Sequence, residues 1–275
     1  IVYADYVTTV SPSYAEEIKT PLGGERLDGL LSARSQSLYG IINGIDTAVY
    51  NAKTDPKIFA NFDLRNLTSK KKENKIALQK QLGLPVDGEK AMIGIVSRLV
   101  DQKGFDIIAE AMGELVNLDI QLVVLGTGEA KYEEMFRQNA WYHPEKVSAN
   151  ITFSDDMAHK IYASADMLLM PSMFEPCGLS QMIAMAYGTI PIVRETGGLK
   201  DSVQPFNEFT GEGNGFSFAP YSAHDMLYTL RLALHFFADK EVWVPLMKRA
   251  MKMDFSWSAS AQKYDEMYQK LLGKS

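Results

Sequence analysis

Apolar, β-rich segments alternate with helix-like segments through the middle of this chain, and this alternation limits its possible folds more than any other feature. The segments that read as strands are Ile93–Val96, Ile120–Leu125, Ile151–Phe153, Met167–Met170 and Thr189–Val193. The helices expected after them span Phe105–Leu115, Lys131–Asn139, Met157–Ala163, Leu179–Tyr187 and Leu199–Val203. Such alternation predicts an α/β fold with a Rossmann-like, doubly wound parallel sheet, which binds ligands where its strands end.

Both ends of the chain differ from this middle part. Tyr6–Val10 and Leu38–Ile42 read as strands near the beginning. Between them, Ser13 is expected to cap a helix, with Glu16 placed for a capping box. The tail is expected to form three helices, over Ala223–Ala238, Glu241–Met253 and Ser258–Leu272.

A polar region joins the opening part to the alternating part. Residues 47–75 are weakly patterned, so they are expected to connect the two and to become helical near Leu78. The charged run Lys70–Glu73 is interpreted as a solvated helix face.

The composition is that of an ordinary globular protein and argues against several partners. Of the 275 residues, 46% are hydrophobic and 23% are charged, and the formal net charge is −6. With no basic stripe interleaved with aromatics, nothing favours nucleic-acid binding. The apolar runs are too short for a membrane span, and no basic and apolar leader is expected at the start. The single cysteine, Cys177, cannot form an internal disulfide, which suits a reducing, cytoplasmic location.

Two cations follow the first strand of the alternating part. Arg98 and Lys103 both fall in the loop expected above the sheet. Together they suit an anionic ligand, with a diphosphate as the first candidate. Arginine and lysine are also common in solvated loops, and this stretch alone fits that interpretation equally well.

The loops after the next two strands offer a nucleotide site in outline. Gly126, Thr127 and Gly128 form a G-x-G turn, but Lys131 stands where a dinucleotide-binding motif has its third glycine. These glycines fit either close approach of a ligand or a plain tight turn. Phe153 fits either a face for a flat base or a place in the core.

The segment Pro171–Gln181 leads from a buried strand into a helix. Pro176 delays the helix and Gly178 removes a Cβ, so the amides of Cys177, Gly178, Leu179 and Ser180 are expected to form an anion site at a helix N-terminus. Glu175 beside it would repel phosphate and is interpreted as a holder of sugar hydroxyls. The plainer alternative makes Glu175 a helix-terminal charge and Cys177 a small buried hydrophobe. The functional interpretation is preferred because a cation pair and a second glycine loop occur at equivalent strand ends.

That second glycine loop follows the strand at 189–193. Thr196, Gly197 and Gly198 offer a hydroxyl and unhindered amides to a ligand. The chain contains no H-E-x-x-H, Walker A or G-x-S-x-G motif, and no Asp-x-Asp pair to hold a nucleotide-bound metal. No metal or other cofactor is therefore expected.

Taken in order, these motifs resemble one known family. Ser97–Gly104, Pro171–Leu179 and Thr196–Leu199 are similar to the corresponding stretches of bacterial glycogen synthases and plant starch synthases (glycosyltransferase family 5, GT-B fold). The resemblance extends over Thr8–Pro12, Asn43–Asp46 and Asp254–Trp257, so it spans essentially the whole chain. It implies retaining transfer of glucose from ADP-glucose to the non-reducing end of an α-1,4-glucan, without a metal.

The resemblance also implies roles for the residues singled out above. Arg98 and Lys103 would stabilise the departing diphosphate, and Glu175 would hold the glucose hydroxyls. The amides from Cys177 to Ser180 would bind glucose and phosphate. Phe153 would lie against adenine, and Gly126–Gly128 would line the nucleotide site. Many related transferases carry a second glutamate eight residues after the first; Ile183 stands there, as the glycogen and starch synthases also lack it.

The same resemblance implies a division of the chain. Residues 1–45 would be the tail of an N-terminal GT-B domain, residues 46–255 the nucleotide-sugar-binding domain, and residues 256–275 a helix that crosses back to the absent N-terminal domain. This chain alone is then expected to bind nucleotide weakly and to transfer glucose poorly. The alternatives are a related enzyme that uses UDP-glucose and a non-catalytic nucleotide-binding domain. A plant source would move the location to the plastid.

Overall fold

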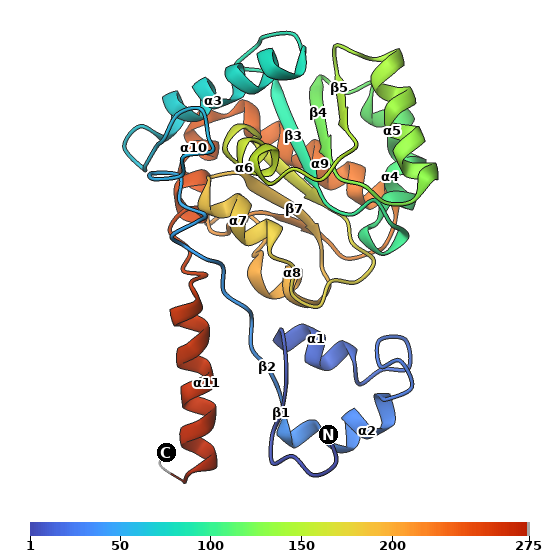
Figure 1. Cartoon of the computed structure of the whole chain (residues 1–275), viewed down its shortest axis with the longest axis vertical. Coiled ribbons are helices and arrows are strands. Elements are labelled where there is room, and N and C mark those ends of the chain that lie inside the picture. Colours follow the sequence, from blue (N-terminus) through green and yellow to red (C-terminus); the bar gives the residue numbers. More distant parts are fainter. Residues whose placement is uncertain (274–275) are drawn as a thin grey trace.

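The computed structural model describes residues 1–273, which form a large α/β body and a smaller extension (Figure 1). The body is built on a parallel sheet of six strands in the order β5-β4-β3-β6-β7-β8. These strands are β3 (Ala91–Val96), β4 (Ile120–Leu125), β5 (Val147–Asn150), β6 (Met167–Met170), β7 (Ile190–Arg194) and β8 (Phe216–Phe218). The predicted doubly wound sheet is confirmed, with one edge strand, β8, that is too short for the sequence pattern to reveal.

Helices cover both faces of this sheet (Figure 1). The set α4 (Phe105–Leu115), α5 (Ala130–Tyr142) and α9 (Ala223–Ala238) packs together, and so does the set α3 (Leu67–Leu82), α6 (Asp155–Ser164) and α7 (Ser180–Ala186). The short helix α8 (Gly197–Ser202) follows β7, and α10 (Lys240–Ala250) packs on α9 and α7. Because both faces are covered, the inner strands β3, β4, β6 and β7 are almost entirely buried and carry the continuous apolar runs seen in the sequence.

The predicted strand Ile151–Phe153 is wrong, because β5 ends at Asn150. The register explains the shift. β5 pairs with β4 from Leu122 opposite Val147 to Leu125 opposite Asn150, and β4 ends at Leu125. In the described part of the chain, residues 151–153 pair with no strand and form a loop, in which Phe153 is 90% exposed.

The charged run Lys70–Glu73 is only partly the solvated helix face that its pattern suggests, because Lys72 and Glu73 are exposed but Lys71 is buried. Helix α3 begins at Leu67, earlier than expected, and two of its lysines are buried. Lys71 Nζ donates to the carbonyl oxygens of Tyr162 and Tyr187 at the C-terminal ends of α6 and α7. Lys75 Nζ pairs with Asp166, 2.7 Å away. These ammonium groups satisfy helix carbonyls and a buried carboxylate, so they join α3 to the body.

The extension consists of the first 40 residues and the last helix. Strand β1 (Val7–Thr9) pairs in parallel with β2 (Leu38–Gly40), and between them lie α1 (Pro12–Glu17), α2 (Asp28–Ala33) and a 3-10 turn at Ser35–Ser37. The cap of α1 is Ser11 instead of the predicted Ser13. Pro12 fits the first helical position, and the Tyr14 amide donates to Ser11 Oγ across 3.3 Å.

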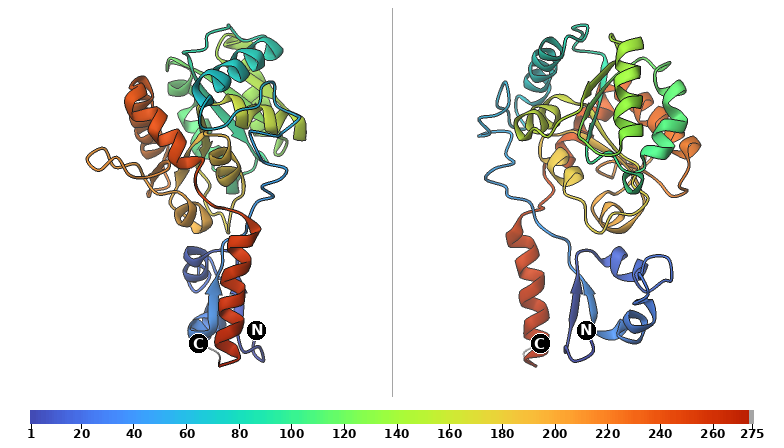
Figure 2. Two further views of the ribbon diagram at one scale, coloured as in Figure 1. Left: turned by 90° about the vertical axis from the view of Figure 1, so that its left-hand side faces the viewer. Right: turned by 45° about the vertical axis from the view of Figure 1, so that its right-hand side comes forward.

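Two segments, residues 41–51 and 251–256, join the extension to the body and are called the crossing segments. The Ile45 amide donates to the Phe255 carbonyl across 2.8 Å, and Ser260 Oγ donates to the Ile42 carbonyl across 2.7 Å. A Cβ on Gly44 would lie 2.4 Å from the Trp257 amide nitrogen, so only glycine allows this approach. Helix α11 (Trp257–Leu271) then runs away from the body beside the β1–β2 pair (Figure 2).

None of the helices in residues 1–273 is long and apolar enough to cross a membrane.

Candidate functional site

The loops after β3 and β4 pack directly on each other at the carboxyl edge of the sheet. The Leu99 amide donates to the Thr127 carbonyl across 2.9 Å, and the Glu129 amide donates back to the Leu99 carbonyl across 2.8 Å. A Cβ on Gly126 would lie 1.8 Å from the Ser97 carbonyl oxygen, and one on Gly128 would lie 2.2 Å from that of Leu99. The two glycines of the G-x-G turn are therefore needed for this loop-to-loop approach, whatever ligand lies above them.

A cavity of about 240 Å³ opens where these two loops meet the segment after β5. Its lining includes Arg98, Gly126, Thr127 and Phe153, so the structure brings together four residues predicted from separate strand ends. Arg98, Thr127 and Phe153 are all exposed. The cavity thus offers an aromatic face and an exposed cation to a flat ligand with an anionic tail.

Lys103, in the segment between β3 and α4, forms an ion pair with Glu175, in the segment after β6. Lys103 Nζ lies 2.5 Å from Glu175 Oε2, and Ser172 Oγ donates to the same carboxylate across 3.3 Å. The Glu175 side chain is only 8% exposed and the Lys103 side chain 18%. The two loops are held together by Gly104, whose Cβ position would be 2.1 Å from the Pro171 carbonyl oxygen. The predicted cation and carboxylate therefore lie at one point, each partly neutralising the other.

The turn after Glu175 presents backbone amides, as its sequence indicates. Gly178 has a φ of 68°, in the left-handed region that favours glycine. Helix α7 starts two residues later, and within the described part of the chain no side chain caps it. Cys177 is buried, and burial raises the pKa of its thiol. Gln181, which the sequence did not single out, is buried beneath the turn and donates to the carbonyls of Cys177 and Gly178.

The glycine loop after β7 is arranged differently from what the sequence predicts. Thr196, Gly197 and Gly198 are buried instead of open to a ligand. The Gly197 amide donates to Glu17 Oε1 across 2.7 Å, and Thr196 Oγ1 donates to the same carboxylate across 3.0 Å. The Gly198 amide donates to the Glu175 carbonyl across 3.0 Å. Sequence reasoning missed Glu17, because no local pattern links residues 180 positions apart.

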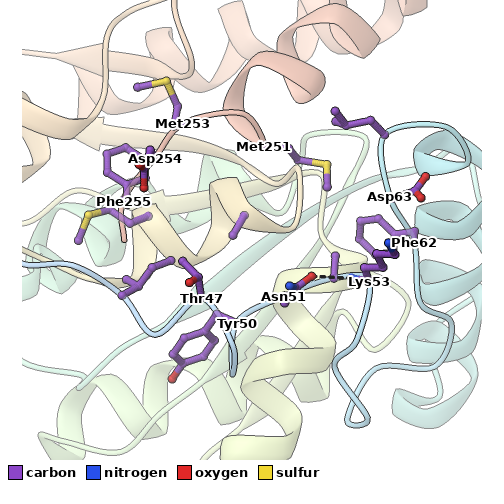
Figure 3. Close-up of a pocket in the computed structure, with 15 residues that line it drawn as sticks. Thr47, Tyr50, Asn51, Lys53, Phe62, Asp63, Met251, Met253, Asp254 and Phe255 are labelled. Atoms are coloured by element: carbon purple, nitrogen blue, oxygen red, sulfur yellow. Dashed lines mark hydrogen bonds between the residues drawn. The ribbon is translucent and has the colours of Figure 1, made fainter. Parts of the chain in front are cut away.

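A second cavity, of about 300 Å³, lies where the crossing segments reach the body (Figure 3). Thr47, Tyr50 and Asn51 line it from one crossing segment, and Met253 and Phe255 from the other. None of the predicted site residues takes part in it. This cavity belongs to the junction between body and extension and not to the strand ends.

Comparison with known families and proteins identifies the relatives of this chain. Residues 78–236 match the family of group 1 glycosyl transferases, and residues 1–33 match the starch synthase catalytic domain. A glycogen synthase of Clostridium novyi (strain NT) is 57% identical over 274 residues, covering 100% of this chain and 57% of the relative. One of Lachnospira eligens is 57% identical over 272 residues, covering 98% of this chain and 57% of the relative. This chain therefore spans somewhat more than half the length of these relatives.

A solved structure extends the likeness to three dimensions. The catalytic domain of starch synthase IV from Arabidopsis thaliana, bound to ADP and acarbose, matches with a TM-score of 0.90 and 39% identity. The match covers 98% of this chain and 56% of that one. A sucrose-phosphate synthase from Thermosynechococcus elongatus, with 20% identity and a TM-score of 0.66, shares the fold alone. The predicted Rossmann-like half of a GT-B fold is confirmed, and the chain belongs to the group 1 glycosyl transferases, in the family of the glycogen and starch synthases.

Proposed function

We propose that this chain is the donor-binding part of a retaining glucosyltransferase that moves glucose from ADP-glucose to the non-reducing end of an α-1,4-glucan. The observation that carries the proposal is that the segment after β3 holds both Arg98, which lines the cavity with Phe153, and Lys103, which pairs with Glu175. A sugar nucleotide needs three recognition elements: cations for its diphosphate, a carboxylate for its sugar hydroxyls and an aromatic face for its base. The close similarity to glycogen synthases supports the same function.

The cations act on the leaving group. When the bond between glucose and the diphosphate breaks, negative charge develops on the phosphate oxygens. Arg98 and Lys103 then stabilise that charge, and such fixed donors are each worth roughly 3 kcal/mol of barrier in comparable sites. Glu175 draws Lys103 toward the sugar and accepts hydrogen bonds from glucose hydroxyls. The chemistry uses these side chains and requires no metal.

Binding of the nucleotide uses the exposed part of the site. Adenine stacks on Phe153, and the diphosphate reaches from the cavity toward Lys103 and the amides of Cys177, Gly178, Leu179 and Ser180. The similarity of this chain to the ADP-bound starch synthase favours adenine over uracil. A related enzyme that uses UDP-glucose remains the second candidate.

We further propose that the extension belongs to a second domain. The β1–β2 pair and helix α11 project away from the body, with α1 as the part of the extension that contacts α8, and residues 1–33 match a starch synthase domain model (Figure 2). The glucan acceptor then binds between the body and the rest of that domain. We expect this chain alone to bind donor weakly and to incorporate little glucose into glycogen.

Calorimetric titration tests the donor site directly. ADP, UDP and NAD are titrated into the chain and into its Arg98→Ala variant, with Arg231→Ala as a control because Arg231 is an exposed arginine of α9 paired with Glu114. We expect ADP to bind more tightly than UDP, with no NAD binding and a loss of about tenfold for Arg98→Ala alone. Preferential NAD binding would contradict the assignment as a transferase. Tighter binding of UDP than of ADP would favour a related enzyme that uses UDP-glucose.

A further inference from the structure

Glu17 joins the extension to the edge of the candidate site. It is the last residue of α1, and its carboxylate accepts from the Gly197 amide across 2.7 Å. Thr196 Oγ1 donates to both oxygens of this carboxylate, across 3.0 and 3.2 Å. Hydrogen bonds to an ionised group are stronger than neutral ones, so this contact fixes the beginning of α8.

The loop that Glu17 holds is itself packed on the turn that carries Glu175. The Gly198 amide donates to the Glu175 carbonyl across 3.0 Å. A Cβ on Gly197 would lie 2.1 Å from that same carbonyl oxygen, and one on Gly198 would lie 2.1 Å from the Cys177 carbonyl oxygen. With so little space between the two backbones, a shift of the loop must move the turn.

Two further contacts of α1 act on the same elements. Ser11 Oγ donates to the Pro176 carbonyl across 2.6 Å, so the cap of α1 also holds the turn. The Ser13 amide and hydroxyl donate to the Asp201 carboxylate across 2.7 and 2.6 Å, which ties α1 to the far end of α8. Glu17 is the member of this set that carries a charge and acts on the glycine loop itself.

We infer that Glu17 is a positioning residue for the donor site: it fixes the Thr196–Gly198 loop and, through that loop, the turn from Glu175 to Cys177. The inference rests on the proposed function and deepens it. A rival account makes Glu17 a competitor that occupies amides otherwise used by the donor phosphates. The two accounts predict opposite changes in nucleotide affinity when Glu17 is removed.

The chain's single cysteine reports on the turn without any ligand. Cys177 is 6% exposed, so its reaction rate with a neutral reagent such as 4,4′-dithiodipyridine follows the opening of the turn. We expect Glu17→Ala to raise this rate about tenfold, in line with the loss of charge-assisted hydrogen bonds, and Glu17→Gln to raise it less. The full pH profile of the rate separates exposure from a changed thiol pKa, because a changed pKa moves the midpoint of the profile, whereas greater exposure raises the plateau above it. The control is Glu16→Ala, on the same helix, where Glu16 is exposed and pairs with Lys19.

ADP titration of the same variants supplies the second measurement. We expect Glu17→Ala to weaken ADP binding several-fold, and Thr196→Val to add little to it because both act through one loop. Thr196→Val also stands in as the test variant if Glu17→Ala does not fold. An unchanged thiol rate, or tighter ADP binding, or unchanged ADP binding would each overturn the inference. If the unmodified chain binds no ADP, the proposed donor site loses its support, while the thiol rate still decides whether Glu17 positions the turn.

Discussion

The carboxyl edge of the sheet has two sides that are built in opposite ways. On the open side, Arg98 and Phe153 stand exposed around a cavity. On the closed side, Glu175 and the Thr196–Gly198 loop are buried, and each has partners within the protein. The open side is free to take a ligand without rearranging, whereas the closed side already holds a fixed network. In the proposed function, the nucleotide enters the open side and the sugar and diphosphate reach the closed one.

The largest expected effect distinguishes the two cations. Lys103→Met leaves the Glu175 carboxylate buried with Ser172 as its remaining partner, and breaking a buried ion pair in this way costs about 3 kcal/mol of unfolding free energy. Arg98→Met removes an exposed side chain and should change the unfolding free energy by less than about 0.5 kcal/mol. Urea denaturation of both variants measures the difference. Equal effects would contradict the contrast between the two sides.

A substitution of glycine tests how tightly the closed side is packed. Gly198→Ala places a Cβ 2.1 Å from the Cys177 carbonyl oxygen, and the backbone must shift, at a cost of about 2 kcal/mol. The matched control is Gly113→Ala within α4, where a Cβ has no neighbour within 4 Å. This substitution should raise the unfolding free energy by roughly 0.5–1 kcal/mol, because alanine favours the helix over glycine. Opposite signs in thermal unfolding are expected. An unchanged unfolding temperature for Gly198→Ala would contradict the tight packing of the closed side.

Helix α3, which buried Lys71 joins to the body, should make the stability depend on pH. Burial lowers the pKa of Lys71 to about 7, well below that of a lysine in the unfolded chain. Above pH 7 the unfolded chain therefore binds more protons than the folded one, so the unfolding free energy rises with pH, by about 1 kcal/mol between pH 6 and 8. The rise should disappear in Lys71→Met, as measured by urea denaturation at each pH. A rise that persists in the variant would assign it to other groups.

An effect of similar size is expected for ligand binding at the open side. Phe153→Ala should weaken ADP binding by about 1 kcal/mol, the lower end of the range for a base stacked on one aromatic ring. Because Phe153 is 90% exposed, the unfolding free energy should stay the same. Calorimetry with ADP and urea denaturation together check both statements. A loss of stability without a loss of affinity would make Phe153 a packing residue.

The sequence predicted the open side better than the closed one, for physical reasons. Arg98 and the Gly126–Gly128 turn lie directly after strands, where local periodicity is informative. Even there the strand before Phe153 was misplaced, because its end is set by the partner strand β4. The burial of Lys71 and the role of Glu17 depend on contacts between distant segments, with carbonyl groups and amides that no local pattern reveals. Charge alone predicts solvent exposure, and only the fold supplies the buried partners.

The measurement that tests the central claim most directly is a crystal structure of this chain with ADP. The account predicts adenine on the Phe153 ring in the cavity of the open side, with the diphosphate within hydrogen-bond distance of Arg98 and Lys103. The Glu175 turn and the Glu17 contact should keep the positions they have without ligand. ADP bound away from the strand ends, or bound there with both cations turned away from its phosphates, would contradict the account.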